Sequence, residues 1–97
     1  KRGEIIFLLR EKLAKRDFKG FFALIKEHPE LKATKEYKKV MEYANRLYQK
    51  ALELLKNEEF EKAKKAATLL LEFPDFEDKA EKILRKIEIA LKFLAYL

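Results

Sequence analysis

The chain has 97 residues, 48% hydrophobic and 41% charged, with two Gly, two Pro and no Cys. This length suits one domain around a single core, the shortage of turn residues argues against a sheet of short strands, and the lack of Cys excludes disulfides and thiolate metal sites. The net charge of +6 is uneven, because residues 1–57 carry fifteen Lys/Arg against eight Asp/Glu and residues 58–97 carry eight against nine.

The first two predicted elements are short helices over residues 4–15 and 18–27. The first places Ile5, Leu9 and Leu13 inward, although its opening turns are apolar nearly all round. Asp17 is the expected N-cap of the second, because its carboxylate can accept a free backbone N–H. The second helix ends before Pro29, since the residue preceding a proline is disfavoured in the helical conformation.

The firmest prediction is one long helix over residues 35–56, capped by Thr34. Its apolar residues recur at spacings of three and four, which places them on one broad face; they are Tyr37, Val40, Met41, Ala44, Leu47, Tyr48, Ala51, Leu54 and Leu55. Asn57 is expected to end this helix and to cap the next.

Two further helices complete the chain. The fourth is predicted over residues 58–72, and the fifth from about Phe76 to the end, with its inward face formed by Ala80, Ile83, Leu84, Ile87, Leu91 and Leu94. We therefore expect a single all-α domain over residues 1–97, with hairpins at 4–28 and 35–73 and a C-terminal helix at 76–97. Because the chain begins with Lys, we expect it to be part of a longer one.

An internal repeat links the two hairpins. Leu13–Phe18 followed by His28-Pro29-Glu30-Leu31 reads like Leu55–Phe60 followed by Phe73-Pro74-Asp75-Phe76. A repeated helical hairpin that cannot bury its apolar face alone is typical of stacked helical arrays.

The second hairpin resembles a tetratricopeptide repeat (TPR). Leu47, Ala51 and Leu54 match the bulky, small and bulky residues of that family's first helix, and Phe60 with Ala63 matches its turn signature. The first hairpin matches less well, since Leu9 and Phe21 stand where small residues are usual. The resemblance implies either a right-handed array or a compact bundle, with the fifth helix as the capping helix.

It further implies a non-enzymatic module that binds a peptide or protein partner through the first helices of its hairpins. The positions of this chain that correspond to the family's binding groove are Phe7, Arg10, Asn45, Tyr48, Gln49 and Leu52.

An alternative reading assigns the basic first half to nucleic acid or another anionic surface. The candidate anion-binding residues are Arg10, Lys12, Lys15, Arg16, Lys19, Lys35, Lys38 and Lys39. A further alternative for these basic side chains is that they only form a solvated surface and bind no partner. Nucleic acid is less favoured than a protein partner, because the neighbouring Phe residues fall at core positions and leave no stacking platform.

No catalytic, cofactor or metal site is predicted. His28 is the only histidine and has no Cys, Ser or second His to work with, and the acid pairs Glu58/Glu59 and Glu77/Asp78 stand at helix starts, where the dipole favours them.

The apolar chain ends and the composition support three weaker expectations. Phe7, Leu8, Ile89, Phe93 and Tyr96 exceed what one face can bury, so they either pack within the domain or form an interface for self-association. No stretch of the chain reaches the length of a membrane span or has a signal-peptide pattern, so the cytoplasm is the default compartment. Abundant Lys and Glu are compatible with a thermophilic source.

Overall fold

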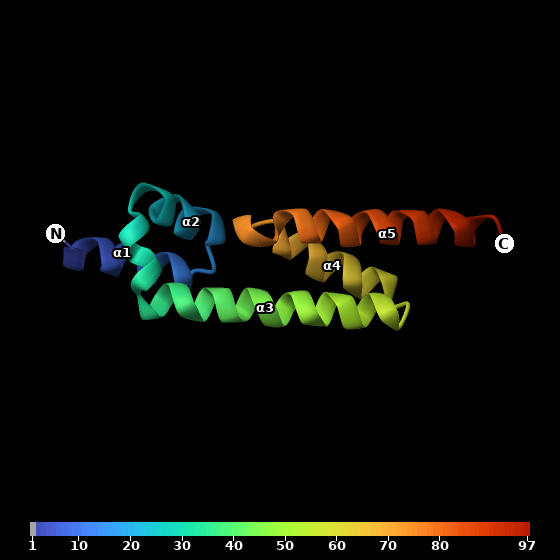
Figure 1. Ribbon diagram of the computed structural model, residues 1–97, viewed down its shortest axis with the longest axis horizontal. Coiled ribbons are helices and arrows are strands. Elements are labelled where there is room, and N and C mark those ends of the chain that lie inside the picture. Colours follow the sequence, from blue (N-terminus) through green and yellow to red (C-terminus); the bar gives the residue numbers. More distant parts are fainter. Residues whose placement is uncertain (1) are drawn as a thin grey trace. The chain divides into compact units, whose positions relative to one another are not determined.

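The computed structural model describes residues 2–97, and over that range it contains five α-helices, two short 3-10 helices and no strand. The prediction of an all-α fold with five helices is confirmed (Figure 1). In chain order the elements are α1 (Arg2–Ala14), α2 (Phe18–Glu27), η1 (Pro29–Ala33), α3 (Lys35–Lys56), α4 (Phe60–Leu70), η2 (Pro74–Phe76) and α5 (Glu77–Ala95).

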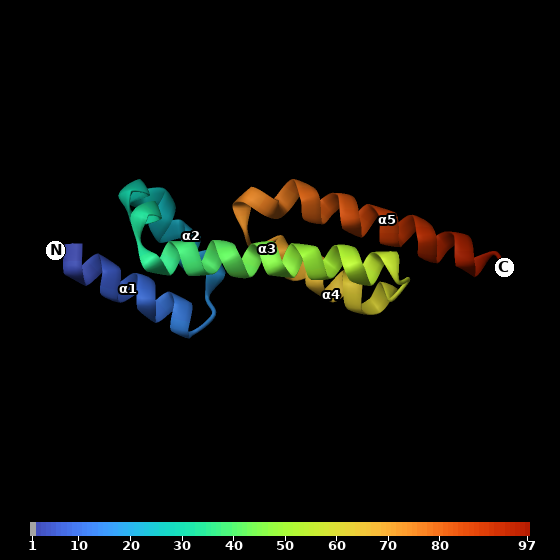
Figure 2. The same ribbon diagram turned by 60° about the horizontal axis from the view of Figure 1, so that its bottom comes forward.

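The chain divides into two compact units, Lys1–Tyr43 and Ala44–Leu97, and the boundary falls within α3. In unit 1, α2 turns back along α1 and contacts both α1 and η1 (Figures 1 and 2). The buried apolar side chains of this unit come from every element; they are Leu9, Phe18, Phe21, Ile25, Leu31 and Val40.

In unit 2, α4 and α5 form the closest helix pair. Leu70, Phe73 and Phe76 are large buried side chains near η2, where α4 ends and α5 begins, and Ile83 and Ile87 continue the buried face along α5. Towards its N-terminus α4 buries only small residues, Ala63 among them. Since an alanine buries far less apolar area than Leu or Phe, the packing between α4 and α5 is strong at the η2 end and thin at the other.

The two hairpins turn in the same way. Arg16 after α1 and Glu58 after α3 have left-handed backbone, with φ of 57° and 60°. In the first turn the Asp17 N–H donates to the Lys12 carbonyl (2.9 Å), and in the second the Glu59 N–H donates to the Leu54 carbonyl (2.9 Å). Each helix therefore ends in a Schellman motif, with a residue other than glycine at the left-handed position.

The proline segments that follow the hairpins also share a geometry. The Leu31 N–H donates to the His28 carbonyl (3.0 Å), and the Phe76 N–H donates to the Phe73 carbonyl (2.8 Å). Leu31 and Phe76 are buried, so each proline begins a 3-10 turn that anchors one apolar residue before the next helix.

Both predicted caps of the first half are confirmed. The Asp17 carboxylate accepts a hydrogen bond from the Gly20 N–H (3.0 Å), and the Thr34 hydroxyl accepts one from the Tyr37 N–H (3.1 Å). The prediction that Asn57 caps the fourth helix is wrong, because Glu58 occupies the left-handed position and the N-cap is Glu59. Consequently α4 is shorter at both ends than predicted.

Predictions for the chain ends were partly wrong as well. Leu91 and Leu94, expected to face inward, are 37% and 48% exposed. The C-terminal turns of α5 extend past the start of α4 in Figures 1 and 2, and Leu91 lines an open groove beside α4. Internal packing of the other apolar end residues is also excluded, since Phe7, Leu8, Ile89, Phe93 and Tyr96 are all exposed.

Candidate functional site

Two of the predicted partner-binding residues lie on α1. Phe7 is 65% exposed, and Arg10 is tied to the start of α3 because its Nε donates to Glu36 Oε2 at 2.7 Å. The hydrogen bond from Arg10 lowers the pKa of the Glu36 carboxyl, although partial burial of Glu36 opposes the shift. The charge of Arg10 is thus largely neutralised within the molecule.

Two more lie together on α3. Asn45 and Gln49 are exposed one turn apart, and with Arg46, Lys50 and Glu53 they line a shallow depression of about 330 Å³. Among the described residues, no side-chain hydrogen bond engages Asn45 or Gln49. Their amide groups are therefore open to a ligand.

Tyr48 and Leu52 share this face of α3 but are half-buried. The Tyr48 ring lies 5.9 Å from the ring of Phe76, and Lys79 Nζ lies 5.1 Å from the centre of the Tyr48 ring. Tyr48 therefore helps to hold η2 and α5, a role that the sequence analysis did not assign to it.

The basic cluster predicted from the sequence lies entirely in unit 1. Lys12 Nζ is 3.5 Å from Asp17 Oδ2, and the Arg16 guanidinium lies 5.8 Å from the centre of the Tyr43 ring. The pKa of Asp17 is lowered, first by its hydrogen bond from Gly20 and then by Lys12. Within the part of the chain that the structure describes, the remaining members have no carboxylate within 4.0 Å; they are Lys15, Lys19, Lys35, Lys38 and Lys39.

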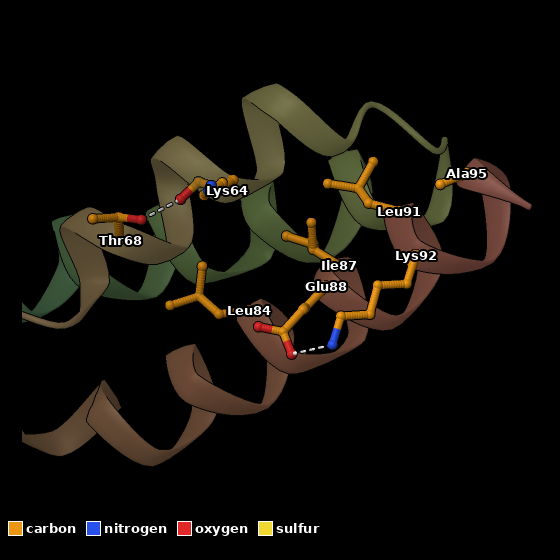
Figure 3. A pocket seen from close by; sticks show the side chains of 8 residues that line it. All are labelled: Lys64, Thr68, Leu84, Ile87, Glu88, Leu91, Lys92 and Ala95. Atoms are coloured by element: carbon orange, nitrogen blue, oxygen red, sulfur yellow. Dashed lines mark hydrogen bonds and ion pairs between the residues drawn. The ribbon is translucent and has the colours of Figure 1, made fainter.

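A further candidate site was not predicted from the sequence. An open groove of about 540 Å³ runs between α4 and the second half of α5 (Figure 3). Its apolar floor is formed by side chains that point from α5 toward α4, and its lining consists of Lys64, Thr68, Leu84, Ile87, Glu88, Leu91, Lys92 and Ala95. The side chains that α4 contributes to its lining are Lys64 and Thr68.

The groove continues into an apolar helix end. Of the residues from Ile89 to Leu97 only Lys92 is charged, and Ile89, Phe93 and Tyr96 are 64%, 65% and 90% exposed. One sequence signal pointed to this surface, namely the apolar residues on both sides of the last turns of α5.

His28 lies between two carboxylates at the end of α2, with Glu27 at 3.8 Å and Glu30 at 3.7 Å. In residues 2–97, no three His, Asp or Glu side chains are grouped closely enough to hold a metal ion. None of the helices described is both long and apolar enough to cross a bilayer.

Comparisons of the chain with protein-family models, with curated proteins and with solved structures give no match.

Proposed function

We propose that this chain is a non-enzymatic interaction module of TPR-like character, which binds a peptide or protein partner through the first helices of its hairpins. The observation that carries the proposal is the exposed face of α3, where Asn45 and Gln49 border a depression and make no side-chain hydrogen bond within the described chain. A side-chain amide both donates and accepts, so two of them one turn apart suit the backbone of an extended peptide.

The half-buried neighbours of these amides support the same proposal. Asn45, Tyr48, Gln49 and Leu52 follow the spacing that places residues on one helix face, so the polar pair stands beside partly covered apolar surface. Ligand sites commonly combine apolar surface with a few polar groups that fix orientation.

A displayed library of random peptides provides the test. Peptides selected on the whole chain should shift backbone amide signals of residues 45–53 in the ¹⁵N-labelled protein. The double variant Asn45→Ala/Gln49→Ala should raise the Kd for those peptides at least tenfold and leave the Tm within a few degrees, because both side chains are exposed.

The matched control is Glu81→Ala/Lys82→Ala, two exposed residues of α5, which should leave the Kd unchanged. Peptides whose affinity survives Asn45→Ala/Gln49→Ala would contradict the proposed face on α3.

A second candidate function is binding to nucleic acid or another polyanion by unit 1. Residues 1–43 carry twelve Lys/Arg against seven Asp/Glu, a net charge of +5, whereas residues 44–97 carry eleven against ten. Within the described residues, five lysines of the basic cluster form no ion pair within 4.0 Å, so their charges are available to phosphates.

This candidate predicts a steep salt dependence. Binding of a labelled random duplex should weaken strongly between 50 and 200 mM salt, and Lys35→Gln/Lys38→Gln/Lys39→Gln should reduce the slope by about three. Lys50→Gln in unit 2 should not change the slope. Affinity that does not respond to salt, or no binding at low salt, would eliminate this function.

A further inference from the structure

α5 carries the apolar pattern of α3 but lacks the cover that α3 has. The α3 residues Val40, Ala44 and Ala51 are matched 43 positions later by Ile83, Ile87 and Leu94. Ala51 is completely buried, whereas Leu94 is 48% exposed. The uncovered part of α5 thus has the pattern of a helix face that packs against another helix.

The end of α5 is apolar on more than one side, since Ile89 and Phe93 lie away from the face that holds Ile83 and Ile87. A helix that is apolar all round requires contact on several sides. The groove between α4 and α5 offers walls from two helices, so it can cover such a helix end better than a flat surface can.

We propose that this groove is occupied by α5 of a second copy of the chain, with the two α5 helices antiparallel about a two-fold axis that lies level with Ala90, on the side of each helix that carries Glu88, Leu91 and Lys92. Each copy supplies one groove and one α5 helix, so a single closed, self-complementary interface fills both grooves. The proposal does not depend on the peptide-binding face of α3.

The charges beside the groove favour this arrangement. Glu88 and Lys92 are equidistant from Ala90, so an antiparallel pair places each Glu88 opposite the second copy's Lys92. A parallel pair would place like charges opposite each other, which is unfavourable. Within one copy Lys92 Nζ lies 3.7 Å from Glu88 Oε1, and both side chains are exposed and free to join a four-charge network (Figure 3).

The end of α5 exposes a large apolar area. Six apolar residues at the end of α5 are between 37% and 90% exposed; they are Ile89, Leu91, Phe93, Leu94, Tyr96 and Leu97. At about 200 Å² for a fully exposed large side chain, they present roughly 800 Å² per copy around the whole helix, and Leu91 among them lines the groove that the second α5 enters.

Sedimentation velocity of the whole chain over a range of concentrations tests the proposal. The mass should rise from 11.6 kDa to twice that value as the concentration increases. Leu91→Lys should raise the dimer Kd more than tenfold while the far-UV circular dichroism stays helical. Phe7→Lys, a comparable change of an exposed residue on α1, should leave the Kd unchanged.

A charge-reversal pair provides a second test that does not alter the apolar surface. Glu88→Lys and Lys92→Glu should each weaken the dimer, because each puts like charges across the axis. An equimolar mixture of the two variants should restore dimers, since every facing pair is then of opposite sign.

A chain that stays at 11.6 kDa at all concentrations would overturn the proposal, as would a mixture that fails to restore dimers. If the monomer instead sediments with vesicles of phosphatidylcholine and phosphatidylserine, and Leu91→Lys abolishes that binding, a lipid surface is the occupant and the dimer is refuted.

Discussion

Replacing Gly20 by Ala tests whether the cap of α2 requires a glycine in its first turn. A Cβ at this position would overlap Asp17 Oδ2 and would lie 2.9 Å from Asp17 Cγ and 2.9 Å from Lys12 Cδ. The long Lys12 side chain can swing aside. The Asp17 carboxylate cannot, unless it gives up the hydrogen bond that it accepts from the Gly20 N–H.

Two opposing contributions of similar size determine how Gly20→Ala changes the free energy of unfolding. Ala is favoured over Gly within a helix by about 1 kcal/mol, and loss of an Asp N-cap costs about 1 kcal/mol. Gly20→Ala in the wild-type chain should therefore change the free energy of unfolding very little. In an Asp17→Ala background no cap remains to be lost, so the same substitution should stabilise the protein by about 1 kcal/mol.

Urea denaturation of the four proteins, followed by circular dichroism at 222 nm, measures this coupling. Ala23→Gly, at an exposed position of α2, is the control and should cost about 1 kcal/mol in both backgrounds. The reasoning is refuted if Gly20→Ala stabilises the wild-type chain as much as it stabilises the Asp17→Ala chain.

Three further predictions concern other contacts. Glu58→Gly removes the Cβ from a left-handed residue and should raise the free energy of unfolding by about 1 kcal/mol in urea titrations; a decrease would show that the Glu58 side chain contributes more than its backbone strain costs. Tyr48→Ala removes the ring contact with Phe76 and should destabilise unit 2 by about 2 kcal/mol, so an unchanged Tm would contradict the structural role of Tyr48. The hydrogen bond from Arg10 lowers the pKa of Glu36, so the pair stabilises the fold above the usual glutamate pKa of about 4.3 and the effect is lost as the pH falls through the lowered value. Because Arg10 is largely exposed, Glu36→Gln should cost less than about 1 kcal/mol at neutral pH and nothing in strong acid, as urea titrations at several pH values would show.

The sequence was sufficient to predict helix boundaries where a single residue determines the local backbone conformation. Asp17, Pro29 and Thr34 set the boundaries of α2 and the start of α3, and the structure has those boundaries as predicted. The left-handed conformation of Glu58 was harder to predict, because a residue with that backbone is expected to be Gly or Asn. The neighbouring Asn57 was therefore the expected end of the helix. The tertiary contact of Tyr48 could not be read from spacing at all, since it depends on where η2 places Phe76.

The groove shows a more general limit of reading helix faces from spacing. Periodicity assigned Leu91 and Leu94 to the buried side of α5 by the same argument that correctly assigned Ala44 and Ala51 in α3. Spacing identifies which residues share a face, but whether that face is covered depends on the length and side chains of the helix opposite. Ala51 is completely buried whereas Leu94 is 48% exposed, so the exposure of Leu94 reflects the lack of a neighbouring helix and not a different apolar pattern. An apolar face left uncovered in this way is where a second chain gains most by binding, which is why the oligomeric state is the first property to measure.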